Sequence, residues 1–250
     1  MKQAAGGAYL EPSNPDVQAY ICKGVEELVK NYAVDGIQFD DYFYPTTEEA
    51  FDAQEYAALG GGLSLAEWRR QNVNTLVKSV YDTVHAAAAG AGRTVVFGIS
   101  PQGNNDNNYN VQYSDVGLWL STPGYVDYVM PQIYWTDRYV TDGKEVPMFS
   151  NRCEVWQTLH TNPEIKLYAG LALYRVGETS DTDLDWALRE DNLATQCAHI
   201  YGMGYDGFAL FRYAYLKENG TQVELQNLYS YLKKQAGILT SEVDAGIVYT

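Results

Sequence analysis

Five short apolar runs alternate with helical patterns along the chain, and this alternation constrains the fold more than any other feature. The runs are near-continuous in apolar residues, as expected for strands that a parallel sheet buries on both faces. Parallel strands joined by helical crossovers form an α/β fold. The expected strands cover residues 35–40, 94–100, 126–134, 167–173 and 207–211.

Helix start signals fall between these runs. Asn14 before Pro15 predicts an N-cap followed by a proline at the first helical position, where its missing N–H costs nothing. Ser64 and Glu67 form a capping-box pattern that predicts a second helix, after a long loop that follows the first strand. Further helices are expected around residues 155–160, 184–203 and 223–235, and the Asn-rich stretch 104–110 is expected to be a polar turn.

The composition excludes several classes of function. The 250 residues include 32 acidic and 17 basic side chains, a formal net charge of -15, so nucleic acid is not an expected partner. No apolar run approaches the ~18 residues of a membrane span, and the N-terminus lacks a signal-peptide pattern. The three cysteines are scattered and the three histidines form no HxxH pair, so neither a metal nor a cofactor is predicted. We expect one domain over residues 1–239, followed by a tail or linker over residues 240–250, with the oligomeric state left open.

Polar and aromatic side chains gather where the expected strands end. In parallel α/β folds the ligand site lies at the carboxyl ends of the strands. Amides for hydroxyl groups, rings for sugar faces and carboxylates for chemistry are the mixture that a carbohydrate needs. The expected substrate-binding residues are Gln38, Tyr44, Ser100, Gln102, Gln132, Tyr134, Trp135, Tyr174 and Arg212. Ordinary packing at the rim is the alternative interpretation of these side chains.

Four segments, residues 35–45, 97–101, 125–135 and 168–174, resemble the glycosyl-hydrolase-like proteins of the bacterial cell envelope, a family-10-like group. The resemblance covers about Tyr9 to Lys234 and implies a TIM-type (β/α)₈ barrel. It also implies hydrolysis of glycosidic bonds, with denuded peptidoglycan glycan as the substrate class and an extracellular or cell-envelope location. The five strands are similar to the fourth to eighth of the family. We therefore expect an incomplete barrel that lacks three N-terminal strands and any export signal.

Two adjacent carboxylates, Asp40 and Asp41, follow the first expected strand and are the predicted catalytic pair. Neighbouring carboxylates raise the cost of ionising one another, so one should keep its proton to higher pH. Asp40 shares a strand face with Gln38 and is assigned the ionised role, and Asp41 the acid role. The segment 35–40 also resembles the nucleophile strand of α-amylase-like barrels, although Gln38 stands where those have Arg.

Other partners for Asp40 stay open at this point. Asp106 and Asp137 lie on later loops, and the second carboxylate could also belong to the missing strands. The competing function is a non-catalytic carbohydrate-binding barrel or an inactive fragment, which would keep the aromatic and amide side chains without needing the acidic pair.

Overall fold

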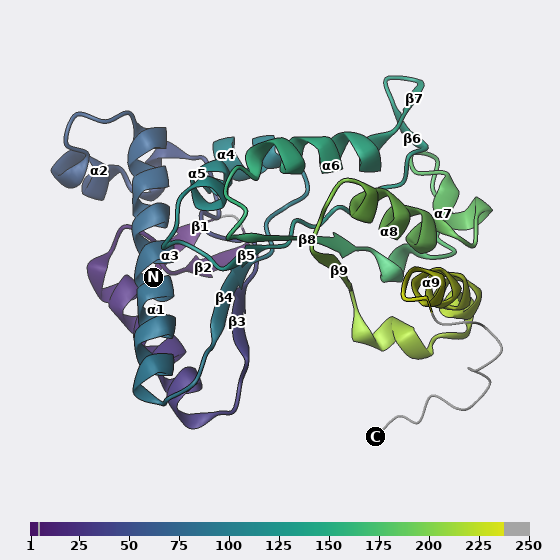
Figure 1. Ribbon diagram of the computed structural model, residues 1–250. Coiled ribbons are helices and arrows are strands. Elements are labelled where there is room, and N and C mark those ends of the chain that lie inside the picture. Colours follow the sequence, from purple (N-terminus) through teal and green to yellow (C-terminus); the bar gives the residue numbers. More distant parts are fainter. Residues whose placement is uncertain (5, 238–250) are drawn as a thin grey trace. The chain divides into compact units, whose positions relative to one another are not determined.

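The computed structural model describes residues 1–4 and 6–237, and the tail expected over residues 240–250 lies outside this range (Figure 1). The chain divides into two compact units. The first unit contains residues 1–132 and 155–168, and the second contains residues 133–154 and those from Ala169 on.

The five expected strands are all present and form one sheet. Its order is β3 (Gly36–Phe39), β4 (Val96–Ile99), β5 (Tyr128–Val129), β8 (Lys166–Leu171) and β9 (Gly207–Leu210). The pairs β3–β4, β4–β5 and β5–β8 are parallel, as crossover connections through helices require. The boundary between the two units falls within β8. This parallel sheet with helices between its strands confirms the predicted class, an incomplete (β/α) barrel.

Two long helices dominate the first unit and contact each other: α1 (Pro15–Asn31) and α3 (Leu65–Gly90). The Asn14 side chain accepts hydrogen bonds from the first-turn amides of α1, and Ser64 and Glu67 form the complete capping box of α3, so both predicted starts are confirmed. Val25 and Val29 are the buried residues of α1.

Short elements complete the first unit, and several were not predicted. They are β1 (Lys2–Ala4), β2 (Gly7–Tyr9), η1 (Glu49–Phe51), α2 (Ala53–Leu59), α4 (Asn105–Asn110) and α5 (Val116–Ser121). The hairpin β1–β2 and the helix α2 occupy stretches without a clear period. The expected polar turn at 104–110 is wrong, because Asn104 accepts from the amide of Asp106 and starts α4.

The second unit contains the end of β8 and all of β9. Its elements are β6 (Tyr139–Thr141), β7 (Lys144–Val146), the start of α6 (Met148–Leu159), η2 (Leu173–Arg175), α7 (Asp185–Leu188), α8 (Asn192–Gly202), η3 (Tyr213–Lys217), η4 (Asn219–Thr221) and α9 (Gln222–Gln235). The helix expected over residues 184–203 is divided into α7 and α8. Arg189 takes an extended conformation, and the Asn192 amide donates to the carbonyls of Asp185 and Arg189, which closes the end of α7.

Each unit has its own apolar core. Val77, Phe97 and Trp119 are fully buried in the first unit, and Leu171 and Trp186 are buried in the second. Across the described ranges, no helix combines the length and the apolar character that crossing a bilayer demands. No three His, Cys, Asp or Glu side chains within residues 1–4 and 6–237 lie close enough to hold a metal ion.

Candidate functional site

β3 delivers the two adjacent carboxylates to the carboxyl end of the sheet. Phe39 packs edge-on against Phe97 of β4, with ring centroids 5.2 Å apart, which fixes the last residue of the strand. The next residue, Asp40, is exposed, whereas Asp41 turns inward and is only 3% exposed. The pair therefore presents one carboxylate to solvent and hides the other.

The exposed carboxylate joins three strand ends. Asp40 Oδ1 accepts from Gln132 Nε2 at 2.7 Å and from the amide of Asp41 at 3.0 Å. Gln132 Nε2 also donates to the carbonyl of Ser100 at 3.1 Å. Asp40 follows β3, Ser100 follows β4 and Gln132 follows β5, so the structure brings together residues that lie far apart in the sequence.

Asp41 is a buried carboxyl group beside a second carboxylate. Its Oδ1 has no hydrogen-bond partner among the described residues. Burial is the main cause that raises the pKa of Asp41, and the hydrogen bond and the negative charge of Asp40 raise it further. The Gln112 side chain acts in the opposite direction. Asp41 therefore keeps a proton more readily than an ordinary aspartic acid does.

Gln38, on the same edge, is held by Tyr128, which was not among the predicted site residues. Tyr128 of β5 donates its hydroxyl hydrogen bond to Gln38 Oε1 at 3.0 Å. Its ring covers Gly98, where an added Cβ would lie 2.2 Å from Tyr128 Cζ. A glycine inside a strand often marks a close approach, so Gly98 was the signal that could have pointed to Tyr128.

A groove of about 460 Å³ runs beside Asp40 in the first unit. Gln38 and Asp40 lie on its polar side, and Val17 and Ile21 of α1 together with Phe43 supply apolar surface. Carboxylate, amide and apolar groups thus border one concave region, which is the usual make-up of a small-molecule site.

Two of the expected substrate contacts are buried instead. Tyr44 is 3% exposed, and its ring packs against Tyr113 and beneath the guanidinium of Arg69. Ser100 is 6% exposed and donates to the carbonyl of Met130 at 2.9 Å. Both side chains hold the strand ends and loops in place, and we leave them out of the proposed site.

The remaining polar candidates differ in how much they are already engaged. Gln102 Oε1 accepts from Asn107 Nδ2 at 3.2 Å in the first unit. Asp106 is exposed in the first turn of α4. In the second unit, both carboxylate oxygens of Asp137 accept from Ser150, through its amide and its hydroxyl, next to the start of α6. This engagement makes Asp137 a structural group rather than a free acid.

In the second unit, aromatic rings from three strand ends form one cluster. Tyr134 follows β5, Tyr174 follows β8 and Phe211 follows β9, and their ring centroids lie 5.7 to 6.0 Å apart. Phe211 is 50% exposed and Tyr174 38%. Phe211 was not predicted as a site residue, because it reads as the last apolar residue of its strand. We call Tyr134, Tyr174 and Phe211 the aromatic cluster.

Arg212 and Trp135 are held by neighbours in the same unit. The Arg212 guanidinium lies 5.7 Å from the centre of the Tyr215 ring, and that of Arg152 lies 5.7 Å from the Trp135 ring. Gln196 donates to the backbone carbonyl of Trp135 at 3.0 Å, which fixes this part of the segment after β5.

Comparison with known families gives one match that spans most of the chain. Residues 2–188 match the family model described as glycosyl hydrolase-like 10. Glycosyl hydrolase DigH of Escherichia coli K12 is 31% identical over 246 residues, which cover 88% of this chain and 53% of that protein. Glycosyl hydrolase YngK of Bacillus subtilis is 33% identical over 217 residues, covering 78% of this chain and 41% of that protein. The chain thus spans about half the length of these relatives.

Solved structures with little sequence similarity share the fold. A glycoside hydrolase family 18 N-acetylglucosaminidase from Paenibacillus barengoltzii matches with a TM-score of 0.61 at 13% identity, covering 88% of this chain and 77% of that one. The glycoside hydrolase domain of PgaB from Bordetella bronchiseptica matches with a TM-score of 0.55 at 14% identity, covering 89% and 66%. At these identities the likeness concerns the fold alone.

Proposed function

Because this chain belongs to the glycosyl hydrolase-like 10 family, we propose that it hydrolyses glycosidic bonds in a bacterial envelope polysaccharide. Denuded peptidoglycan glycan is the proposed substrate, and the extracellular space or cell envelope is the proposed location. Residues 1–239 would form the catalytic barrel portion. The observation that carries this proposal is the adjacent pair Asp40 and Asp41, of which one is exposed and one is buried.

The unequal environments of the two carboxyl groups support a division of roles. Asp41 keeps its proton to higher pH than an ordinary aspartic acid, because burial and the neighbouring Asp40 both raise its pKa. Asp40 then carries the negative charge at the surface, positioned by Gln132 Nε2. A negative charge at this place stabilises the positive charge that develops on the sugar carbon in the transition state, or attacks that carbon.

The burial of Asp41 bears on its expected role as the acid. A carboxyl group that is 3% exposed offers almost no surface to a sugar, so we propose that its direct effect is on Asp40. We propose that Asp41 lets the pair hold a single negative charge and places that charge on Asp40. Direct proton donation by Asp41 to the glycosidic oxygen stays a prediction.

The proposed substrate contacts are amide side chains in the first unit and aromatic rings in the second. Gln38, Gln102 and Gln132 offer amide groups for sugar hydroxyls. Tyr134, Trp135, Tyr174 and Arg212 of the second unit offer ring faces and a guanidinium. Aromatic rings bury a large area against the apolar face of a sugar while keeping polar edges hydrated.

The test measures the release of reducing ends from peptide-free peptidoglycan glycan strands. Asp40→Asn should lower kcat by about a hundredfold or more, because the charge that stabilises the transition state is lost, whereas glycan binding should persist. Asp106→Asn, at an exposed aspartate of the same unit, is the matched control and should leave the rate unchanged.

Two outcomes would contradict the proposal. If Asp40→Asn keeps the rate within a few-fold of the wild-type value, the catalytic carboxylates lie elsewhere. If the wild-type chain binds glycan without releasing reducing ends, the non-catalytic carbohydrate-binding function is favoured instead.

A further inference from the structure

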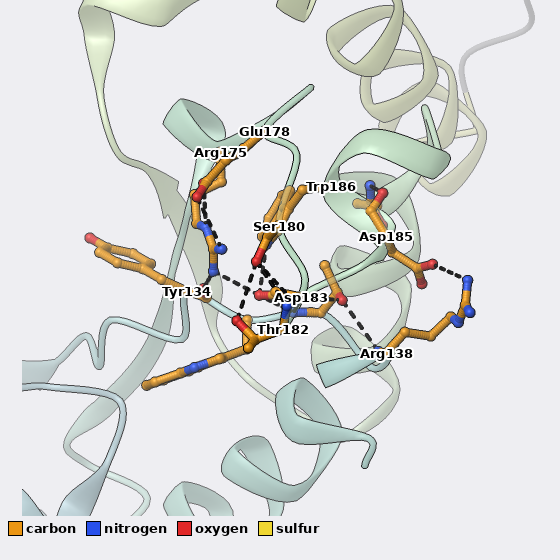
Figure 2. A network of polar contacts seen from close by, with 12 residues as sticks. Tyr134, Arg138, Arg175, Glu178, Ser180, Thr182, Asp183, Asp185 and Trp186 are labelled. Atoms are coloured by element: carbon orange, nitrogen blue, oxygen red, sulfur yellow. Dashed lines mark hydrogen bonds and ion pairs between the residues drawn. The ribbon is translucent and has the colours of Figure 1, made fainter. Parts of the chain in front are cut away.

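A buried carboxylate, Asp183, lies at the centre of a polar network in the second unit (Figure 2). Its side chain is fully buried and accepts hydrogen bonds from three residues. Thr136 donates through its amide at 3.1 Å and through its hydroxyl, Arg175 donates through Nη1 at 2.7 Å, and Trp186 donates through Nε1 at 2.9 Å. This many donors, one of them charged, offset the cost of burying the charge.

Arg175 extends the network to the segment that follows β5. The same Nη1 that contacts Asp183 also donates to the backbone carbonyl of Tyr134 at 2.8 Å. The guanidinium is oriented from its other side by Glu178, which accepts from Nε at 2.7 Å. Figure 2 shows Arg175 between Asp183 and the backbone of Tyr134, while the Tyr134 ring points away from the network.

The network therefore fixes the backbone from which two rings of the aromatic cluster project. Tyr134 is held at its own carbonyl by Arg175, and two residues later Thr136 is held by Asp183. Tyr174 directly precedes Arg175, and its amide donates to the carbonyl of Phe211 at 3.1 Å. Asp183 and Arg175 thus restrain the two segments whose rings meet at 5.7 Å.

Asp183 and Arg175 contact loop segments rather than the strands of the sheet. The sheet is already held by its backbone ladder, so a buried ion pair adds little to it, and buried ion pairs are weak evidence for stability in general. Its distinctive effect is geometric, because it fixes the backbone positions from which the rings project before a ligand arrives. Such preorganisation lowers the entropy cost of binding.

We propose that Asp183 and Arg175 are positioning residues that hold Tyr134 and Tyr174 in the arrangement that binds the glycan. The proposal rests on the proposed function, since it takes the aromatic cluster as a glycan-binding surface of the second unit. Neither residue contacts the sugar. Their effect is on glycan affinity and KM, with kcat left to the carboxylate pair of the first unit.

The experiment measures the binding of peptide-free peptidoglycan glycan strands to the full chain carrying Asp40→Asn, so that turnover is blocked. Adding Arg175→Met should raise Kd about tenfold, because misplaced contact groups lose much of their binding energy. Arg138→Met is the matched control. Arg138 lies in the same region and pairs with Glu145 and Asp185 without touching Tyr134 or Asp183, so Kd should stay unchanged.

A double-mutant cycle separates positioning from a general loss of stability. Tyr134→Ala alone should weaken binding, and adding Arg175→Met to it should weaken binding little further, because Arg175 acts through the backbone from which the Tyr134 ring projects. Arg175→Lys and Thr136→Val are milder variants that keep the test possible if Arg175→Met does not fold. Each of them should raise Kd, but by less than Arg175→Met does.

The possible results separate this proposal from the proposed function. Binding that depends on Arg175, without any release of reducing ends, would support the positioning role and contradict the hydrolase. Hydrolysis with an unchanged KM in Arg175→Met would overturn the positioning role alone. Equal effects of Arg138→Met and Arg175→Met, strictly additive effects in the cycle, or no glycan binding to the Asp40→Asn chain would also overturn it.

Discussion

At the scale of single residues, the chain carries buried acids, Asp41 and Glu224, whose ionisation opposes stability as pH rises. The folded state holds the proton of Asp41 more tightly than the unfolded chain does, because its pKa is raised above 3.8 by burial and by Asp40. This contribution to the free energy of unfolding is present at low pH and is lost as pH rises through the raised pKa.

Asp41→Asn should therefore raise Tm at pH values above the raised pKa of Asp41. It should leave Tm nearly unchanged below pH 3.8, where Asp41 is protonated in both the folded and the unfolded state. Thermal unfolding followed by circular dichroism at pH 3 and pH 8 measures the difference. A lower Tm for Asp41→Asn than for the wild type at pH 8 would contradict the prediction, because it would mean that the ionised carboxylate stabilises the fold.

Glu224 gives a second residue-scale prediction, in the second unit. It is 1% exposed, and burial raises its pKa from 4.5 to about 7, while its Oε1 accepts from the amide of Leu193 in the first turn of α8. Stability from this group is complete below pH 4.5 and is lost as pH rises through 7. Glutamine keeps the acceptor and has no charge to bury.

Glu224→Gln should thus raise the free energy of unfolding above pH 7 by on the order of 3 kcal/mol, and change it little below pH 4.5. Urea unfolding at pH 4 and pH 8 provides the measurement. Glu218→Gln, at an exposed glutamate of the same unit, is the control, and a pH-independent effect of Glu224→Gln would contradict the explanation.

Whether the role of a single residue could be predicted from the sequence depended on its tertiary surroundings. Asp40 and Gln132 stand out because polar residues ending buried strands must lie at the sheet edge. Tyr44 was misplaced because a tyrosine after a strand looks the same in sequence whether its loop turns outward or, as here, folds over Arg69. The depth of a loop residue depends on tertiary contacts that no local pattern records.

At the scale of elements, the contact between β4 and β5 is the most constrained. Gly98 leaves room for the Tyr128 ring, and Tyr128 in turn holds Gln38 of β3. A methyl group at position 98 would overlap that ring, and overpacking of this kind costs about 1–3 kcal/mol.

Gly98→Ala is therefore expected to lower the free energy of unfolding by about 2 kcal/mol, and to weaken glycan binding through the loss of the Gln38 contact. Tyr128→Phe removes only the hydroxyl, so it should weaken binding with a smaller loss of stability. Denaturant titration and glycan affinity distinguish the two. A Gly98→Ala chain as stable as the wild type would mean that the ring moves away freely.

The elements themselves were predictable where a periodic pattern coincided with a capping signal. Asn14 with Pro15 and Ser64 with Glu67 located the starts of α1 and α3. The split between α7 and α8 was not predicted, although the polar run over residues 189–192 interrupts the apolar spacing there. The break itself depends on the Asn192 side chain, which donates to two backbone carbonyls. The hairpins β1–β2 and β6–β7 have three-residue strands, too short to establish a period.

At the scale of the whole molecule, β3 is an outer strand of the sheet, and the apolar groove between it and α1 borders the same edge. Outer strands offer backbone hydrogen-bonding groups to another chain, and apolar surface adds to the attraction. We expect concentration-dependent self-association in sedimentation velocity experiments.

Ile21→Lys places a charge in that groove and should shift the equilibrium toward the monomer. Tyr20→Lys is the matched control, because Tyr20 on the same helix is 71% exposed and does not line the groove. A wild-type chain that stays monomeric at high concentration would contradict the prediction, as would equal effects of the two lysine variants.

The division of the chain into two units also sets an order of events during synthesis. The ribosome completes residues 1–132 first, but the strand β8 that pairs with β5 begins only at Lys166. Residues 133–154, which belong to the other unit, emerge in between. The nascent first unit therefore has β5 unpaired on one side until the residues from Lys166 on have been synthesised, and a chaperone has most to protect during that interval.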